Sequence, residues 1–176
     1  MKSYTKNQLM RLHIALMLNS DKRNIYLKKH NVFYSMGNNV FFQPRIIPSD
    51  PKLIKFHDNI VVTSNVTFVT HDIFNQGLNN LNQGHFAYEQ KPIEIMDNVF
   101  IGCNSTILGN IRIGPNAVIA AGSVVTKDVE EGTVVAGNPA RVIETFNDFV
   151  EHRKNQEECF DLNTIWNKFY EEKNKD

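Results

Sequence analysis

The stretch that decides the fold reads IEIMDNVFIGCNSTILGNIRIGPNAVIAAGSVVTKDV and covers residues 93–129. An aliphatic residue occupies every sixth position along it, at Ile95, Ile101, Ile107, Ile113, Ile119 and Val125. This period fits neither an amphipathic helix, which repeats about every 3.6 residues, nor a strand that alternates between two faces. It is the period expected when each side of a solenoid coil is one short strand.

Glycine and asparagine are frequent between the aliphatic positions, at Gly102, Asn104, Gly109, Asn110, Gly114, Asn116 and Gly122. These residues adopt positive φ and tight turns more readily than others do, so they suit the corners of a coil. The pattern therefore predicts an all-β solenoid whose stacked coils bury a column of Ile and Val. Because each coil contacts only its neighbours, a loop can leave from any corner.

The first half carries the same period more weakly, at Met36, Phe42 and Pro48 and again at Phe56, Val62 and Phe68, with Val40, Ile46, Ile60 and Val66 at the accompanying fourth positions. The segment PSDP (Pro48–Pro51) marks a small insertion between the two series. The next gap, from Phe68 to Ile95, is not a multiple of six, so an extruded loop is predicted over residues 70–92. Loops longer than about 12–15 residues are usually functional or disordered.

Both flanks have helical patterns. Residues 6–30 predict helix, broken near Asn19–Asp21, with an apolar side of Leu9, Leu12, Leu16 and Ile25. The tail after Phe146 holds Leu162, Ile165, Trp166, Phe169 and Tyr170 at helical spacing. We divide the chain into an N-terminal helical segment (1–33), the solenoid (34–145) and a helical tail (146–176).

Composition and net charge limit the classes of molecule that the chain is expected to bind. The 176 residues are 41% hydrophobic and carry 19 basic and 19 acidic side chains, so the net charge is zero. This gives no strong field for nucleic acid or an anionic membrane, and a small-molecule partner is expected. The apolar run Leu12–Leu18 is far shorter than the ~20 residues of a membrane span. Cys103 and Cys159 form no metal-binding motif, and a cytoplasmic location is expected.

The phrases AAGSVVTKDV (120–129) and AGNPARVI (136–143) resemble the hexapeptide-repeat acetyltransferases. Around Thr70-His71-Asp72 the chain is similar to the galactoside, maltose and nodulation-type O-acetyltransferases of that superfamily. The resemblance covers about residues 34–145. It implies a left-handed parallel β-helix, a homotrimer, acetyl-coenzyme A as acetyl donor and no metal.

Two histidines of the predicted loop are candidates for the acceptor side. A neutral imidazole, with a reference pKa of ~6.5, can take a proton from a hydroxyl and pass it to a leaving thiolate. His71 lies just past an inward-facing repeat position, and the family resemblance points to it as the general base. His85 lies further out on the loop. We assign His85, Asp72 and Phe100 to acceptor binding; the family often has Trp in place of Phe100.

The resemblance also implies how the donor is held. It places Ala121 and Thr126 along the pantetheine arm and Lys127 and Arg141 near the phosphates of coenzyme A. Cys103 joins this cofactor-binding group; no sequence signature marks it as an acyl-carrying nucleophile. No phosphate-binding glycine motif is present, so backbone amides of the solenoid are expected to bind the pantetheine.

These residues favour direct acetyl transfer to a hydroxyl of a sugar or a related small acceptor. Acetylation of serine, an amino sugar or an antibiotic stays open, as does an inactive scaffold. A γ-class carbonic anhydrase is a further alternative, because His57, His71 and His85 offer the three ligands that catalytic zinc needs. Their even spacing lacks the close histidine pair expected there, and the AGNPARVI ending favours the acetyltransferases.

Overall fold

The computed structural model describes residues 2–154, 158 and 160–174, in two compact units that meet at residues 146 and 147. The first unit opens with helices α1 (Lys2–Leu16) and α2 (Ser20–Lys29). The strands that follow are β1 (Ser35–Met36), β2 (Val40–Phe42), β3 (Ile54–Phe56), β4 (Ile60–Val62), β5 (Thr67–Val69), β6 (Ile93–Ile95), β7 (Val99–Ile101), β8 (Thr106–Leu108), β9 (Ile111–Ile113), β10 (Ala117–Ile119), β11 (Val124–Val125), β12 (Thr133–Ala136) and β13 (Arg141–Thr145). Helix α3 (Phe74–Asn79) lies between β5 and β6, and a 3-10 turn covers Pro51–Leu53.

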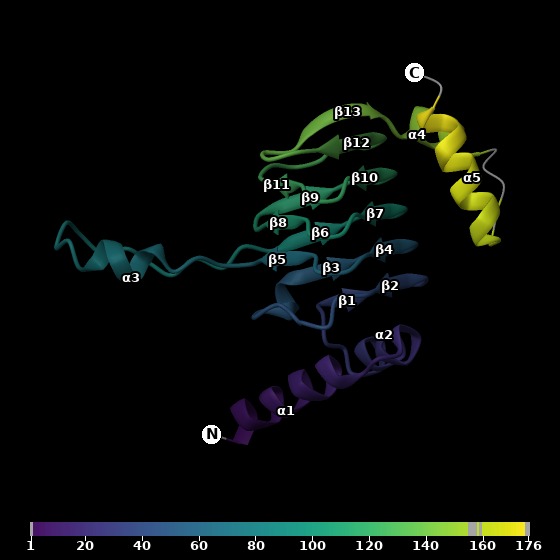
Figure 1. The fold of residues 1–176 in the computed structure, drawn as a ribbon. Helices are drawn as coiled ribbons and strands as arrows, with labels where there is room; N and C mark the ends of the chain where they lie inside the picture. The colour runs from purple at the N-terminus through teal and green to yellow at the C-terminus, as the bar shows by residue number, and fades with distance from the viewer. Residues whose placement is uncertain (1, 155–157, 159, 175–176) are drawn as a thin grey trace. The chain divides into compact units, whose positions relative to one another are not determined.

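The strands form the three sides of a parallel β-helix (Figure 1). Their orders are β1-β3-β6-β9, β13-β12-β10-β7-β4-β2 and β11-β8-β5. Ile93 pairs with Ile111, so one complete coil takes 18 residues, or three hexapeptides. Ile54 pairs with Ile93 at a spacing of 39, so the segment between β5 and β6 adds 21 residues to a coil. Strand β13 pairs antiparallel with β12 and ends the sheet, a reversal that the repeat does not predict.

The predicted aliphatic column is confirmed: Ile95, Ile101, Ile107, Ile113, Ile119 and Val125 are all at most 1% exposed. Aromatic rings fill the first coils, where Phe33 packs on Phe42 and Phe56 with ring centroids 5.1 and 4.9 Å apart. At the PSDP insertion the expected register is wrong. Ile47 is buried in place of Pro48, and Ile46 is 83% exposed, because the insertion shifts the chain by one position.

Asparagine builds the corners, as the composition predicts. Asn39, Asn59, Asn98 and Asn116 all have positive φ, between 51° and 59°. Their side-chain amides form a ladder along one edge, in which each Nδ2 donates to the next Oδ1 at 3.0, 3.1 and 2.9 Å. The same residue thus supplies both the left-handed backbone that turns the corner and a bond to the next coil.

The N-terminal helices cover the first coil with a different face from the predicted one. Asn19 caps α2, since its Oδ1 accepts from Lys22 N at 2.8 Å. Ile14, Leu27 and Arg23 are buried. The expected apolar side is wrong, because Leu9, Leu12, Leu16 and Ile25 are each 58–69% exposed. No helix among the described residues is long and apolar enough to cross a membrane.

The second unit holds the predicted helical tail. It contains most of α4 (Phe146–Arg153) and α5 (Leu162–Lys173), and Asp161 caps α5 by accepting from Thr164 N at 2.9 Å. Trp166 stacks on Tyr170 along α5, with ring centroids 5.8 Å apart. The five aromatic and aliphatic residues of the predicted pattern are 41–70% exposed. Cys159 lies outside the described residues.

Candidate active site

The segment between β5 and β6 leaves the solenoid as a long arm (Figure 1). Its two stems pair at the base, where Lys91 N donates to Thr70 O at 2.7 Å and His71 bridges Gln90. Gly109 of the next coil lets this base pack closely, because a Cβ there would lie 2.3 Å from the Lys91 Cβ. The predicted loop therefore has a fixed root, and helix α3 gives it structure of its own.

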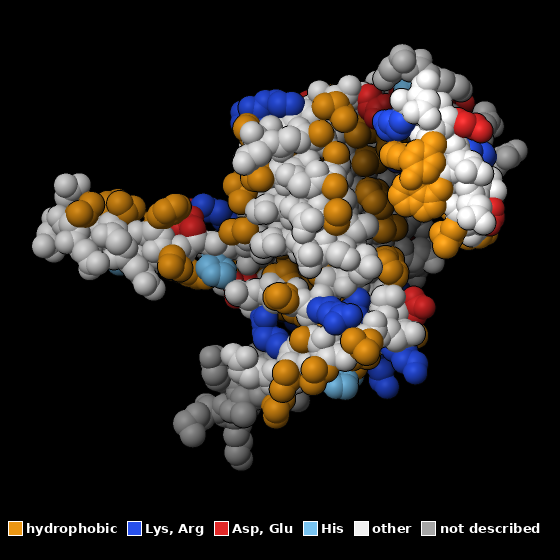
Figure 2. All heavy atoms as spheres, viewed as in Figure 1, with side chains coloured by type: hydrophobic (Ala, Val, Ile, Leu, Met, Phe, Trp, Pro, Cys, Tyr) orange, Lys and Arg blue, Asp and Glu red, His pale blue; other side chains and the backbone are white. Residues whose placement is uncertain are grey.

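The outer part of this arm exposes several apolar side chains among its Asn and Gln residues. Ile73, Phe74, Leu81 and Tyr88 are 48–74% exposed, and Figure 2 shows hydrophobic side chains along its length. Exposed apolar side chains gathered on one projecting segment indicate a contact surface.

His71 lies at the fixed root. Its Nδ1 is 2.8 Å from Asp50 Oδ2, and the two side chains are only 26% and 32% exposed. Both atoms are buried from solvent, and the contact is close but is not aligned as a hydrogen bond. The His71 ring also lies 5.6 Å from the Tyr88 ring. Because Nδ1 faces the carboxylate, Nε2 is the nitrogen presented for proton transfer.

Asp50 is the residue that sequence reasoning missed. It belongs to the PSDP insertion and precedes the turn Pro51–Leu53, which its side chain does not cap. Arg11 of α1 fixes the insertion by donating to the carbonyl oxygens of Ile47, Pro48 and Ser49 at 2.7, 2.7 and 2.6 Å. The sequence feature that could have pointed to Asp50 is its position between two prolines at a break in the six-residue repeat.

Asp72 is engaged within the arm. Its Oδ2 lies 3.1 Å from Lys91 Nζ, and its Oδ1 accepts from Phe74 N at 3.3 Å. The hydrogen bond from Lys91 is the main reason why the pKa of Asp72 lies below its ordinary value. Burial, followed by the charges of Asp50 and Asp72, raises the pKa of Tyr88. Asp72 thus anchors the start of α3, and its assignment to acceptor binding stays a prediction.

The other two acceptor candidates lie apart from His71 in the chain. His85 is exposed on the outer arm. Phe100 is 40% exposed and projects from β7, opposite Val61 and Val118 of the six-stranded sheet, whereas His71 follows the three-stranded sheet. Within one subunit, the structure does not place Phe100 on the side of His71.

Four of the five predicted donor residues flank the three-stranded sheet, and Arg141 lies on the six-stranded sheet. Thr126 and Lys127 follow β11 at the edge where His71 follows β5, two coils away, or about 10 Å at ~4.8 Å per coil. Cys103 and Ala121 stack at the other edge, where Gly122 N donates to Cys103 O at 2.8 Å. Arg141 begins β13. All five side chains are exposed.

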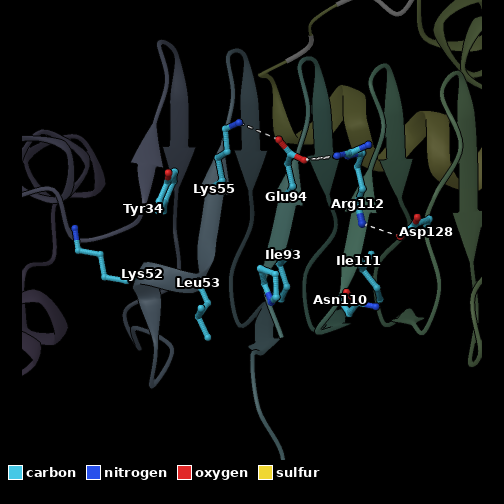
Figure 3. Close-up of a pocket in the computed structure, with 11 residues that line it drawn as sticks. Tyr34, Lys52, Leu53, Lys55, Ile93, Glu94, Asn110, Ile111, Arg112 and Asp128 are labelled. Atoms are coloured by element: carbon cyan, nitrogen blue, oxygen red, sulfur yellow. Dashed lines mark hydrogen bonds and ion pairs between the residues drawn. The ribbon is translucent and has the colours of Figure 1, made fainter. Parts of the chain in front are cut away.

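A separate hollow of about 560 Å³ lies on the β1-β3-β6-β9 face (Figure 3). A charge ladder crosses it: Glu94 lies 3.0 Å from Lys55 Nζ and 2.9 Å from Arg112 Nη2. His57 Nε2 also contacts Glu94, at 2.9 Å. None of the predicted site residues lines this hollow, and the ladder satisfies its own charges, so we interpret it as structural.

The zinc alternative finds no support in the arrangement of its three histidines. His57 bonds to Glu94, His71 faces Asp50 and His85 lies on the outer arm. Across the described residues, no three His, Cys, Asp or Glu side chains of one chain gather as a metal site.

The ladder predicts a pH-dependent stability. Hydrogen bonds, first from His57 and then from Lys55, lower the pKa of Glu94 from 4.5 to about 2. A depressed carboxyl pKa stabilises the fold above the unfolded value and loses that effect as the pH falls toward the folded value. Glu94→Gln should lower the unfolding free energy by about 1–2 kcal/mol at pH 7, allowing for partial exposure.

In urea titrations at one protein concentration, this difference should shrink between pH 4.5 and 2. Glu131→Gln, at an exposed position, is the matched control. A Glu94 deficit that is the same at pH 7 and pH 2.5 would contradict the assignment.

Comparison with known proteins identifies the repeat. The sequence profile of the family described as bacterial transferase hexapeptide (six repeats) matches residues 92–127. These residues are therefore similar to the hexapeptide repeats of bacterial transferases. The matched region holds β6 to β11, and so most of the predicted donor residues.

Two relatives extend the similarity of this hexapeptide-repeat chain. It is 35% identical over 129 residues to the galactoside O-acetyltransferase of Escherichia coli K12, covering 69% of this chain and 61% of that protein. It is 48% identical over 63 residues to the 2,3,4,5-tetrahydropyridine-2,6-dicarboxylate N-acetyltransferase of Staphylococcus aureus, covering 36% of this chain and 26% of that protein. The chain thus spans about three fifths and one quarter of these relatives' own lengths.

Solved structures share the fold. A maltose O-acetyltransferase from Clostridium difficile 630 matches with a TM-score of 0.56 at 28% identity, covering 80% of this chain and 87% of that one. A galactoside acetyltransferase in complex with coenzyme A matches with a TM-score of 0.63 at 24% identity, covering 89% and 87%. These likenesses, with the family profile, support the left-handed sense that the resemblance implies.

Proposed function

We propose that the chain transfers an acetyl group from acetyl-coenzyme A to a hydroxyl of a sugar or a related small acceptor. The observation that carries this proposal is the His71–Asp50 pair, 2.8 Å apart and half-buried at the fixed root of the arm. A histidine whose Nδ1 faces a carboxylate is held in one orientation, and its imidazolium form is stabilised as it appears. This arrangement suits a general base.

The transfer follows in two proton steps. His71 Nε2 takes the proton of the acceptor hydroxyl while the oxygen attacks the thioester carbonyl carbon. The tetrahedral oxyanion is stabilised by nearby backbone N–H groups. The carbon–sulfur bond then breaks, and the imidazolium returns its proton to the thiolate. The products are the acetyl ester and free coenzyme A, with His71 neutral again.

The donor is proposed to lie over the three-stranded sheet, one edge of which carries His71, Thr126 and Lys127. With the thioester at His71, the pantetheine arm would extend over the exposed backbone of the coils, whose other edge carries Ala121 and Cys103. Its phosphates would then meet the cations Lys127 and Arg141. The two structural relatives named above, one of them solved with coenzyme A, are named as sugar acetyltransferases, which supports this reading.

The acceptor class follows the names of the more broadly matching relatives, which are galactoside and maltose O-acetyltransferases. The short match to an N-acetyltransferase keeps an amine acceptor in view. A thiol-release assay decides between them, with purified protein, acetyl-coenzyme A and a panel of neutral sugars, acidic sugars, amino sugars, serine and aminoglycosides. Acceptor-dependent thiol release that is confined to hydroxyl acceptors supports the proposal. No release above the hydrolysis rate with any of them would refute it.

The assembly is proposed to be a homotrimer. The solenoid buries its own interior, but the arm exposes the apolar side chains of Ile73, Phe74 and Leu81, which a second surface would cover. Cyclic closure by identical copies supplies one, and would place His71 between subunits. Light scattering at micromolar concentration tests this, and a monomer near 20.2 kDa would refute it.

Donor binding gives a separate prediction. Lys127→Ala and Arg141→Ala should each weaken coenzyme A binding by about 1–3 kcal/mol, the scale of a lost charge-assisted hydrogen bond. The KM for the acceptor should hardly change. Calorimetric titration with coenzyme A measures the effect, and Lys29→Ala on α2 is an exposed control. Unchanged donor affinity in both variants would place the phosphates elsewhere.

A further inference from the structure

A second, larger hollow of about 820 Å³ lies between the N-terminal helices and the first coils of the solenoid. Ala15, Leu18 and Ser20 line it from the helical side, and the chain after β2 and the chain leading into β5 line it from the solenoid side. We call it the arginine groove, because Arg23 and Arg45 are its charged residues. Among the described residues that line it there is no Asp or Glu.

Arg23 is an unusual residue to bury. It is only 2% exposed, and its Nη1 and Nη2 donate to Met17 O and Gln43 O, each at 2.7 Å. Its Nε is buried without a partner. Neutral carbonyls alone therefore compensate a full positive charge, which is costly in a partly dry environment.

Arg45 adds a second positive charge at the same place. It is exposed, and its guanidinium forms no hydrogen bond or ion pair within the described part of the chain. Burial, followed by the charge of Arg45, lowers the pKa of Arg23, so the two cations lie close enough to repel each other. Two like charges kept together without a carboxylate favour an anion from outside the chain.

The groove lies at the start of β5, and the proposed base His71 lies just past the end of that strand. Phe68 lines the groove, and His71 follows three residues later, so the two Cα atoms are at most about 11 Å apart. Pro48 also lines it, two residues before Asp50. Ser64, Thr67 and Gln43 add polar groups suited to hydroxyls. A ring-sized acceptor that presents a hydroxyl to His71 would thus extend into the groove.

We propose that the arginine groove binds an anionic group of the acceptor, a carboxylate or a phosphate, so that the preferred substrates are acidic rather than neutral sugars. This rests on the proposed acetyl transfer for its reaction, but not for its binding chemistry. Arg45 makes the contact, because a guanidinium pairs with two oxygens of either anion. Arg23 adds positive potential from behind and holds Gln43 in place.

Calorimetry on the full chain tests the binding without any reaction. The probes are a hexuronic acid, a hexose 1-phosphate and the parent neutral hexose, at pH 7 in a buffer without phosphate. At least one anionic sugar should bind 10-fold or more tightly than the neutral one, and added salt should weaken it. The tighter of the two identifies carboxylate or phosphate. Equal binding of all three sugars, or no binding of either anionic sugar, would overturn the inference.

Variants separate the groove from general charge effects. Arg45→Gln should weaken the anionic sugar at least 10-fold and leave the neutral sugar unchanged, while Arg45→Lys should keep part of the affinity. Lys22→Gln removes an exposed positive charge one residue from Arg23 that does not line the groove, so it should have little effect. Arg23 is a poor test, because its replacement removes two buried hydrogen bonds.

The donor decides between two uses of the anion site. If Arg45→Gln weakens coenzyme A binding rather than sugar binding, the groove serves the donor and the inference is wrong. Binding of an acidic sugar that depends on Arg45, in a protein without any thiol release, would leave the groove assignment standing while acetyl transfer fails.

Discussion

His71→Ala is expected to lower kcat by about 10²- to 10⁴-fold while coenzyme A binds almost as tightly as before. The imidazole accepts the proton that moves in the transition state. Its loss therefore raises the activation free energy and hardly changes the free energy of coenzyme A binding. The root of the arm holds this histidine in place through the bridge to Gln90 and the 2.8 Å contact with Asp50. Steady-state kinetics and calorimetry with coenzyme A measure the two quantities.

His85→Ala is the matched control, since it removes the other histidine of the same arm. Its side chain is exposed, and the change should alter the acceptor KM or do little. Asp50→Asn should keep part of the activity and shift the pH profile of kcat/KM, because Asp50 acts through His71. An inactive His85 variant beside a His71 variant within a few-fold of the parent would reverse the assignment.

The solenoid was predictable because its determinants repeat. Ile101 and Ile107 point inward for the same geometric reason, so one period predicts the whole column. Asn98 and Asn116 turn the same corner one coil apart, and the residue type alone indicates positive φ. The bounds of the arm were also predictable, because the six-residue period stops at Phe68 and resumes at Ile95, and the structure inserts 21 extra residues there.

Of the His71–Asp50 pair, the sequence pointed only to His71. Its partner Asp50 lies 21 positions earlier in an insertion, and their contact depends on how Arg11 fixes three carbonyl groups there. No local pattern encodes such a contact. The prediction of the buried helix faces was wrong for a related reason. Helix α2 buries Arg23 rather than Ile25, because the carbonyl oxygens of Met17 and Gln43 accept hydrogen bonds from Arg23. Tertiary partners decided these faces, and periodicity did not.

The buried aliphatic column also packs against the strands that carry the proposed site residues. Ile107 of β8 is fully buried and pairs with Phe68 of β5 below and Val125 of β11 above. Phe68 lies three residues before His71, and Val125 lies two residues before Lys127. One side chain therefore packs between the strands that carry the proposed base and the proposed phosphate ligand.

Ile107→Ala should lower the unfolding free energy by about 2–5 kcal/mol, and Ile107→Val by about 0.5–1.5 kcal/mol. The alanine leaves a cavity that the stacked coils cannot close, since hydrogen bonds to both neighbouring strands fix their spacing. Urea unfolding at one protein concentration measures the loss, and Ile25→Ala, at a residue 68% exposed, should change it by less than about 0.5 kcal/mol. The cavity also removes the packing between Phe68 and Val125, which lie near His71 and Lys127 in the chain. We therefore expect kcat to fall as well, even at urea concentrations below the unfolding transition. If the Ile107→Ala protein were as stable as the parent, the side chains around Ile107 would have to repack without cost. In that case the column would not hold His71 rigidly.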